Sequence, residues 1–123
     1  MDEQTASSEG ADLALDTERA GNAATIRVSG ELDAYTAPNL DELCRSLYED
    51  GVRAVVVDFR ATSFLDSSGL RALLSSHRRF ADEGGSLRVV DPSEPVLRLL
   101  EITGLSEHFG VEPRSAEPSG ESG

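Results

Sequence analysis

The stretch from residue 53 to residue 74 reads RAVVVDFRATSFLDSSGLRALL, and it decides the fold. Its first seven residues are mostly apolar and include three consecutive β-branched valines, which is typical of a central strand covered on both faces. A short loop follows, and a helix is expected to begin near Ser67, because Leu70, Leu73 and Leu74 then recur at helical spacing. The stretch therefore predicts a buried strand, a loop and an amphipathic helix.

The sequence on either side continues this alternation of strands and helices. Residues 12–18 and 24–29 alternate polar and apolar side chains around Gly21-Asn22, which predicts a hairpin at one edge of a sheet. The other expected elements are a helix capped by Thr36 and ended at Asp50-Gly51, a strand over 86–90, a helix over 93–103 and a short last strand within 105–111. The order β-β-α-β-α-β-α(-β) predicts an α/β domain with helices packed on a mixed sheet.

The composition favours a single acidic domain that binds proteins or small molecules. The chain has 123 residues and a formal net charge of −12, and its 11 positive side chains are all arginines. This balance disfavours nucleic acid and anionic membranes as partners. The single cysteine, Cys44, allows no internal disulfide and no cysteine-rich metal site, and we expect a cytoplasmic protein without a signal peptide or a membrane span.

Both ends of the sequence are polar. Residues 1–11 are acidic, and residues 112–123 are rich in Pro, Ser, Gly and Glu without a large apolar side chain. Neither segment can bury enough apolar surface to offset the loss of chain entropy, so both are expected to be disordered. The folded domain is predicted to span residues 12–111.

The sequence lacks the common enzyme motifs. It has no phosphate-binding GxxxxGK[ST] or GxGxxG loop, no GxSxG nucleophile turn and no HExxH metal motif. His77 and His108 are expected at a core edge and in a surface loop, and Cys44 is expected in the core. No cofactor is implied.

Three carboxylates leave an enzymatic alternative open. Asp58 ends a predicted strand, Asp66 follows shortly after it, and Asp33 lies in a separate loop. All three could gather at one end of the sheet, where they could hold a divalent metal. A small nucleotide-binding enzyme or hydrolase that uses Asp33, Asp58 and Ser67 is therefore the alternative function. No general base is recognisable near Ser67, which counts against it.

Asp66-Ser67-Ser68-Gly69 stands at the start of the predicted helix, and two interpretations fit it. In the structural interpretation, Asp66 or Ser67 caps the helix and Gly69 allows close packing. In the regulatory interpretation, Ser67 carries a phosphate at the helix N-terminus, where backbone N–H groups and the helix dipole favour anions. Such a phosphate would add about −1.5 to −2 charge and change the surface without unfolding the domain.

Two motifs, in their order and spacing along the chain, resemble those of a known bacterial family, the STAS-domain anti-sigma-factor antagonists. The first is Gly30-Glu31-Leu32-Asp33, followed by Thr36 and a helix, and the second is Ser63-Phe64-Leu65-Asp66-Ser67-Ser68-Gly69-Leu70. The resemblance covers about residues 12–111. It implies a STAS-like fold.

The resemblance also implies a function and a set of partners. Members bind an anti-sigma factor, often a serine kinase, and thereby release a sigma factor for transcription. The kinase phosphorylates the serine that matches Ser67 and so ends binding, and a serine/threonine phosphatase resets the protein. Asp33 matches an acidic residue that lies beside this serine, and a scaffold subunit of a stress-signalling complex is a further alternative. The residues expected to contact the partner are Asp33, Thr36, Leu65, Asp66, Ser68, Gly69, Leu70 and Arg71, with Arg78 and Arg79 as further candidates for ion pairs.

Overall fold

The structure is a computed structural model that describes residues 13–111. The predicted disorder of residues 1–11 and 112–123 concerns segments outside these described residues and stays a prediction.

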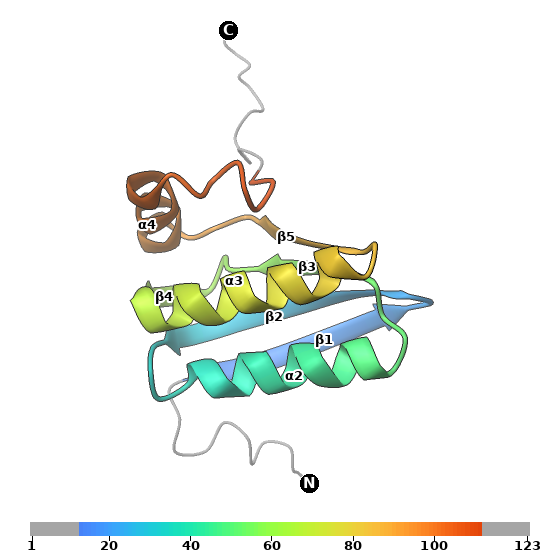
Figure 1. Ribbon diagram of the computed structural model, residues 1–123. Coiled ribbons are helices and arrows are strands. Elements are labelled where there is room, and N and C mark those ends of the chain that lie inside the picture. Colours follow the sequence, from blue (N-terminus) through green and yellow to red (C-terminus); the bar gives the residue numbers. More distant parts are fainter. Residues whose placement is uncertain (1–12, 112–123) are drawn as a thin grey trace, which may run out of the picture.

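A five-stranded mixed sheet lies at the centre of the fold (Figure 1). The predicted hairpin is confirmed as an antiparallel pair of β1 and β2, and β3, β4 and β5 all run parallel to their neighbours. The sheet order is β1-β2-β3-β5, with β4 paired to the end of β2. The strands are β1 (Leu13–Ala20), β2 (Ala23–Leu32), β3 (Ala54–Asp58), β4 (Thr62–Leu65) and β5 (Ser86–Val90).

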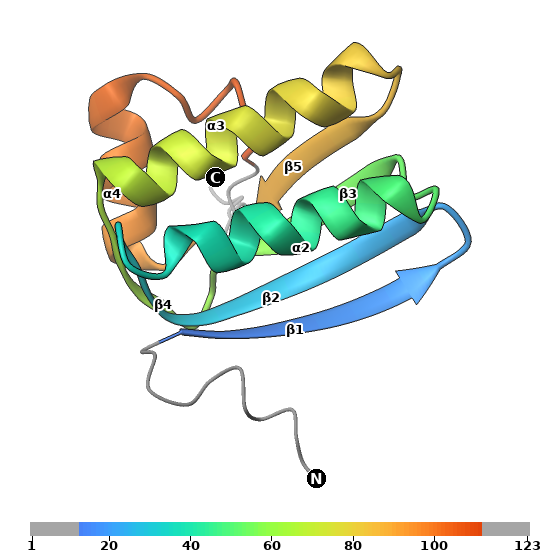
Figure 2. The ribbon, with the colours of Figure 1, turned by 60° about the horizontal axis from the view of Figure 1, so that its bottom comes forward.

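Two helices, α2 (Ala37–Glu49) and α3 (Ser67–Asp82), lie side by side on one face of this sheet (Figures 1 and 2). The third helix, α4 (Glu94–Thr103), packs beside β4. Alternate strand residues that face α2 and α3 are almost fully buried and form the core, among them Ile26, Val28, Val55, Val57, Leu87 and Val89. The predicted mixed α/β fold is confirmed.

The sequence-based prediction for the central strand is right for one face of the sheet only. Val55 and Val57 are buried under the helices, whereas Ala54, Val56 and Asp58 on the other face are only partly buried. Because the helices cover one side of the sheet, the second face needs no large apolar side chain.

The stretch expected to be a loop after β3 contains a strand that the sequence did not reveal. β4 has four residues, which is too short for a clear alternation of polar and apolar side chains. Its pairing is fixed by the tertiary structure, since Thr62 donates its hydroxyl to the carbonyl of Val28 at 2.7 Å and the register shifts between Gly30 and Glu31.

The last predicted strand, within residues 105–111, is wrong. This segment forms turns, in which the N–H of Phe109 bonds to the carbonyl of Leu105 and the N–H of Val111 to that of Ser106. The segment meets the edge of β5 through a hydrogen bond from the N–H of Val89 to the carbonyl of Phe109. Because the turns satisfy the backbone groups locally, no ladder forms.

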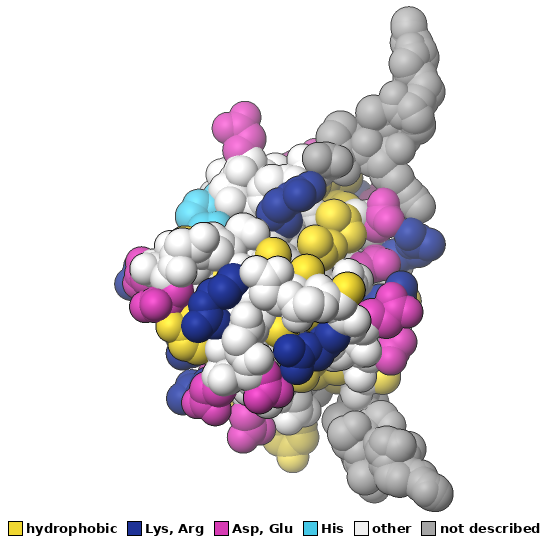
Figure 3. Space-filling view, turned by 90° about the vertical axis from the view of Figure 1, so that its right-hand side faces the viewer, with side chains coloured by type: hydrophobic (Ala, Val, Ile, Leu, Met, Phe, Trp, Pro, Cys, Tyr) yellow, Lys and Arg dark blue, Asp and Glu magenta, His cyan; other side chains and the backbone are white. Residues whose placement is uncertain are grey.

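The end of the molecule opposite the start of α3 carries charges of both signs. Arginine and acidic side chains lie among separate hydrophobic patches there (Figure 3). Arg19 at the end of β1 pairs with Asp50 after α2 at 3.2 Å. Charges of both signs therefore mix at this end.

Candidate functional site

Asp66 caps α3 with its side chain. Its Oδ1 accepts the backbone N–H groups of Ser68 at 2.9 Å and Gly69 at 3.1 Å. Asp66 has extended backbone angles, as expected of an N-cap residue. Of the two residues that the sequence offered as a cap, the structure selects Asp66.

Ser67 is the first residue of α3, and its side chain is exposed. Because Asp66 provides the cap, the Ser67 hydroxyl has no hydrogen-bond partner among residues 13–111. The same arrangement corrects one expectation about a phosphate at this position. The N–H groups of Ser68 and Gly69 are already used by Asp66, so a phosphate on Ser67 would find these donors occupied and a carboxylate beside it.

A second turn, between β2 and α2, is held together by Asp33 and Thr36. Asp33 Oδ1 accepts the backbone N–H groups of Tyr35 at 3.0 Å and Thr36 at 3.1 Å. The Thr36 hydroxyl accepts the N–H of Asp33 at 3.0 Å and donates to the carbonyl of Glu31 at 2.8 Å. Thr36 stands at the N-cap position of α2, but its side chain does not cap the helix as predicted, because these turn contacts use its oxygen.

The two turns lie against each other. The N–H of Asp66 donates to the carbonyl of Leu32 at 3.2 Å, and a Cβ added to Gly69 would lie 2.7 Å from the same carbonyl oxygen. It would also lie 2.7 Å from Cδ1 of Leu65. Gly69 thus allows the first turn of α3 to sit on the end of β2, and the two sequence motifs form one surface.

Residues that precede and follow Ser67 in the sequence line two separate hollows on the surface. One, of about 370 Å³, lies between α2 and α3 and includes Ser68 and Arg71 in its lining. The other, of about 400 Å³, lies between β4 and α4 and includes Phe64 and Ile102, which are 46% and 74% exposed. The free hydroxyl therefore stands next to surfaces that another protein could fill.

The residues expected to contact a partner fall into two groups. Arg71 and Ser67 are exposed, and Ser68, Asp66 and Asp33 are partly exposed. Four others are buried, so they can shape the surface but present little of their own side chains: Thr36, Leu65, Gly69 and Leu70.

Of the two further arginines on α3, Arg78 is exposed, whereas Arg79 lies 3.7 Å from Asp41 of α2 and is partly buried there. Arg79 therefore links the two helices.

Residues 14–117 match the STAS domain family. The chain belongs to this family. The STAS domain described here is 34% identical over 86 residues to the anti-sigma-B factor antagonist of Staphylococcus aureus (strain NCTC 8325 / PS 47), a match that covers 70% of this chain and 80% of the relative. It is 31% identical over 101 residues to the anti-sigma-B factor antagonist of Bacillus subtilis (strain 168), covering 82% and 92% of the two chains. These matches place it among the anti-sigma-factor antagonists.

The same STAS fold is found in SpoIIAA. The unphosphorylated form of that anti-sigma factor antagonist has a TM-score of 0.71 at 23% identity, over 84% of this chain and 91% of the other. The phosphorylated form of the Bacillus protein has a TM-score of 0.66 at 22% identity, over 84% and 95% of the two chains. The architecture predicted from the resemblance is thereby confirmed.

The three carboxylates of the alternative metal site do not form one. Asp33 and Asp66 use an oxygen in their own turns, and Asp58 Oδ1 accepts the N–H of Arg60 at 2.8 Å. Within residues 13–111 no group of three His, Cys, Asp or Glu residues is arranged to hold a metal ion. Among the helices of these residues none is long and apolar enough to cross a bilayer.

Two features of the STAS domain were not apparent from the sequence. His77 of α3 and His108 of the C-terminal segment stack with ring centroids 4.3 Å apart, and both rings contact Phe109. Burial, and then the neighbouring His108, lower the pKa of His77. Tyr35 lies in the turn beside the Ser67 surface and is 85% exposed. The motif spacing placed Asp33 and Thr36 in this turn, but only the fold shows that the ring between them faces solvent.

Proposed function

We propose that this STAS domain binds an anti-sigma factor with serine kinase activity, which frees a sigma factor for transcription, and that phosphorylation of Ser67 ends the interaction. The observation that carries this proposal is the exposed and unpartnered hydroxyl of Ser67 next to a helix cap made by another residue. Modification of this hydroxyl breaks no contact of the fold. SpoIIAA, which shares the fold, is known in phosphorylated and unphosphorylated forms, which supports a switch of this kind.

The surface proposed to meet the anti-sigma factor centres on Ser67. Arg71 lies one helical turn after it and is free to pair with an acidic group of the partner. Tyr35 and Phe64 offer exposed rings on the flanking turn and strand, and aromatic side chains and arginines often dominate the binding energy of interfaces. The buried residues Thr36 and Gly69 hold the two turns in place.

Phosphorylation would act through charge and desolvation. A phosphate on Ser67 would place about −1.5 to −2 charge beside the carboxylate of Asp66. The nearby N–H groups of Ser68 and Gly69 already donate to Asp66 and are not available to the phosphate. An interface that buried this group without a cationic partner would lose several kcal/mol, roughly. A loss of about 3 kcal/mol already weakens binding by more than a hundredfold. The same chemistry requires a serine/threonine phosphatase to restore the binding form.

The test combines mass spectrometry with binding. The anti-sigma kinase of the source organism and ATP should add one phosphoryl group to the wild-type protein and none to Ser67→Ala, while Ser68→Ala should still be modified. Ser67→Glu should weaken binding to the kinase at least about thirtyfold, which is roughly 2 kcal/mol. Ser86→Glu is the matched control, because Ser86 is exposed at the start of β5, at the end of the molecule opposite Ser67. Phosphorylation of Ser67→Ala, or unchanged binding by Ser67→Glu, would overturn the proposal.

No observation favours the alternatives of a small hydrolase, a nucleotide-binding enzyme or a scaffold subunit. The relatives are named antagonists and carry no enzyme name. The proposed function and the single cysteine both favour the cytoplasm as the site of action.

A further inference from the structure

β1 is an edge strand of the sheet. It has eight residues and pairs with β2 on one side, and no strand within residues 13–111 pairs with its other side. An unpaired edge of this length offers a row of backbone N–H and C=O groups to an added strand.

The register of the hairpin shows which backbone groups point outward. Ala20 and Ala23 flank the two-residue turn Gly21-Asn22, and the residues that flank such a turn form a hydrogen-bonded pair. Hydrogen-bonded and non-hydrogen-bonded pairs alternate along an antiparallel ladder. Glu18, Asp16 and Ala14 therefore bond to β2, whereas Thr17, Leu15 and Leu13 turn their N–H and C=O groups to the free edge.

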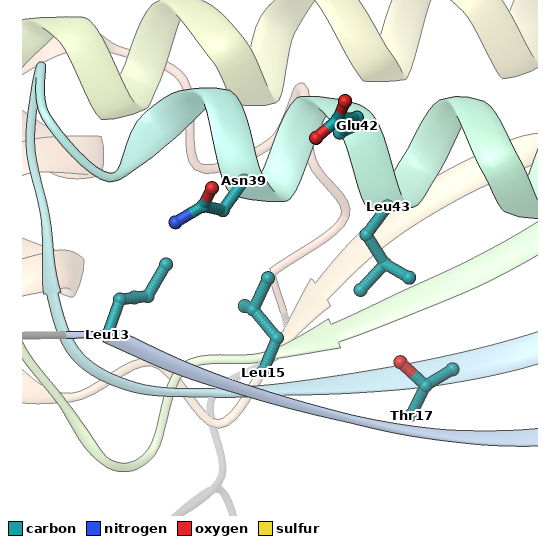
Figure 4. Close-up of a pocket in the computed structure, with 6 residues that line it drawn as sticks. All are labelled: Leu13, Leu15, Thr17, Asn39, Glu42 and Leu43. Carbon is teal, nitrogen blue, oxygen red and sulfur yellow. The ribbon is translucent and has the colours of Figure 1, made fainter. Parts of the chain in front are cut away.

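The side chains of the same three residues line a hollow under α2. Leu13, Leu15 and Thr17 rise from β1 toward the helix, and Leu43 descends toward them (Figure 4). The hollow has a volume of about 440 Å³, and Asn39 and Glu42 complete its lining. A strand added to this edge would thus find backbone partners and, for every second side chain, a space lined in part by three leucines.

The charges around the hollow are mainly negative. Glu42 is the one charged residue among the described residues that line it, and no described cation pairs with it. On the other face of β1, Asp16 and Glu18 share a single arginine, Arg27, at 3.8 and 3.2 Å. An incoming strand with lysines or arginines would compensate this excess.

The same charges argue against two other occupants. Residues 1–12 contain four acidic side chains and no basic one, so they match the hollow poorly. A second copy centred on β1 in antiparallel register would set Asp16 opposite another Asp16 or opposite Glu18, and like charges directly opposite each other are destabilising.

We propose that the outer edge of β1 and the hollow under α2 bind an extended segment of another protein that alternates apolar side chains with lysine or arginine. This surface goes beyond the proposed function. It lies on the opposite side of α2 from the hollow that contains Ser68 and Arg71, so its occupation does not depend on Ser67.

The probe is a fluorescent eight-residue peptide that alternates valine or leucine with lysine. The full-length protein should bind it saturably and lose affinity at high salt. A peptide with glutamate in place of lysine should bind at least about tenfold more weakly, or roughly 1.4 kcal/mol. A lysine peptide methylated at every second backbone nitrogen keeps its charge but cannot complete the ladder, so it should also lose at least about tenfold. Equal binding of the methylated peptide would overturn the proposal, since the contact would then be electrostatic only.

Hydrogen exchange and two variants locate the peptide. It should slow exchange at the N–H groups of Leu15 and Thr17 and leave those of Asp16 and Glu18 unchanged. Thr17→Pro removes an outward N–H and should weaken binding at least about tenfold. Thr17→Val keeps this N–H and should weaken binding much less, while Ser67→Glu should bind the peptide as the wild type does. Glu42→Gln, which removes an exposed charge, should reduce affinity for the lysine peptide.

Slow hydrogen exchange at the N–H groups of Leu15 and Thr17 before peptide is added would show that this edge is already covered. If the protection grows with protein concentration, a second copy covers the edge; if it does not, the chain covers its own edge. Either result would overturn the proposal. If the wild-type protein failed to bind the peptide but was phosphorylated at Ser67 as proposed, this inference would be wrong and the proposed function would stand.

Discussion

The carboxylate of Asp66, and not the hydroxyl of Ser67, accepts the N–H of Ser68 at the start of α3, at a distance of 2.9 Å. The two adjacent side chains therefore have separate tasks. Asp66 stabilises the helix end, and Ser67 is left exposed for chemistry that leaves the fold unchanged. This separation would let one turn serve both as a structural cap and as the proposed switch.

The two tasks can be separated by mutation. Asp66→Ala should lower the free energy of unfolding by about 1 kcal/mol, because two backbone N–H groups lose their acceptor. Ser67→Ala should change it by less than about 0.5 kcal/mol, since the hydroxyl is exposed and unpartnered. Urea unfolding followed by circular dichroism measures both, and Asp66→Asn, which can still cap, is the control. Equal losses for Asp66→Ala and Ser67→Ala would show that Ser67 shares the cap.

Gly69 should not tolerate even one added methyl group. A Cβ at this position meets the carbonyl oxygen of Leu32 at 2.7 Å, and a backbone atom cannot move aside easily. Gly69→Ala should therefore destabilise the domain by about 1–3 kcal/mol, in spite of the higher helix propensity of alanine. Ser75→Ala, on the exposed face of the same helix, should be neutral or slightly stabilising. A stabilised Gly69→Ala protein would contradict the close contact between α3 and β2.

The histidine pair should make stability depend on pH. The pKa of His77 is lower in the folded protein than its ordinary value of 6.5, through burial and then through the neighbouring His108. As the pH falls through the unfolded value, the unfolded chain takes up a proton that the folded protein resists, so stability declines. Above that value the imidazole of His77 is neutral in both states, and its titration no longer lowers the stability.

The measurement is the free energy of unfolding between pH 7.5 and pH 5.5. His77→Gln should flatten the decline over this range, and His108→Gln should flatten it in part, because it removes the neighbouring charge and leaves the burial. A wild-type protein as stable at the lower pH as at the higher one would rule out this role of His77.

Cys44 should react slowly in the folded protein. Burial raises the pKa of its thiol to about 11, and the side chain is fully enclosed by the core. The thiolate is the reactive form, so a disulfide reagent at pH 8 should modify the native protein at least about a hundredfold more slowly than the protein in guanidinium. Similar rates in both conditions would mean that the space between α2 and α3 opens readily.

Much of the fold could be predicted from local sequence patterns. The alternation around Gly21 predicted the hairpin of β1 and β2, and the spacing of Leu70 and Leu73 predicted α3, because burial on one face leaves a period of two or of 3.6 in the sequence. The start of α3 at Ser67 was also foreseen. These features depend on residues close together in the chain.

Other features depend on contacts between distant segments, and no local pattern reveals them. β4 is a strand because its four residues meet the end of β2, and the segment that ends at Val111 is not one because its own turns satisfy its backbone. The stacking of His77 on His108 requires the C-terminal segment to fold back over α3.

The sequence by itself determined the order of elements, the acidic character and the serine turn that marks the family. Only the tertiary structure decided that Asp66 caps α3 while Ser67 stays free, and that Gly69 must lie against Leu32. It alone showed that the open edge of β1 borders a hollow lined in part by leucines. The physical reason is that side-chain periodicity is written along the chain, whereas hydrogen-bond partners and free edges are settled when the elements pack together.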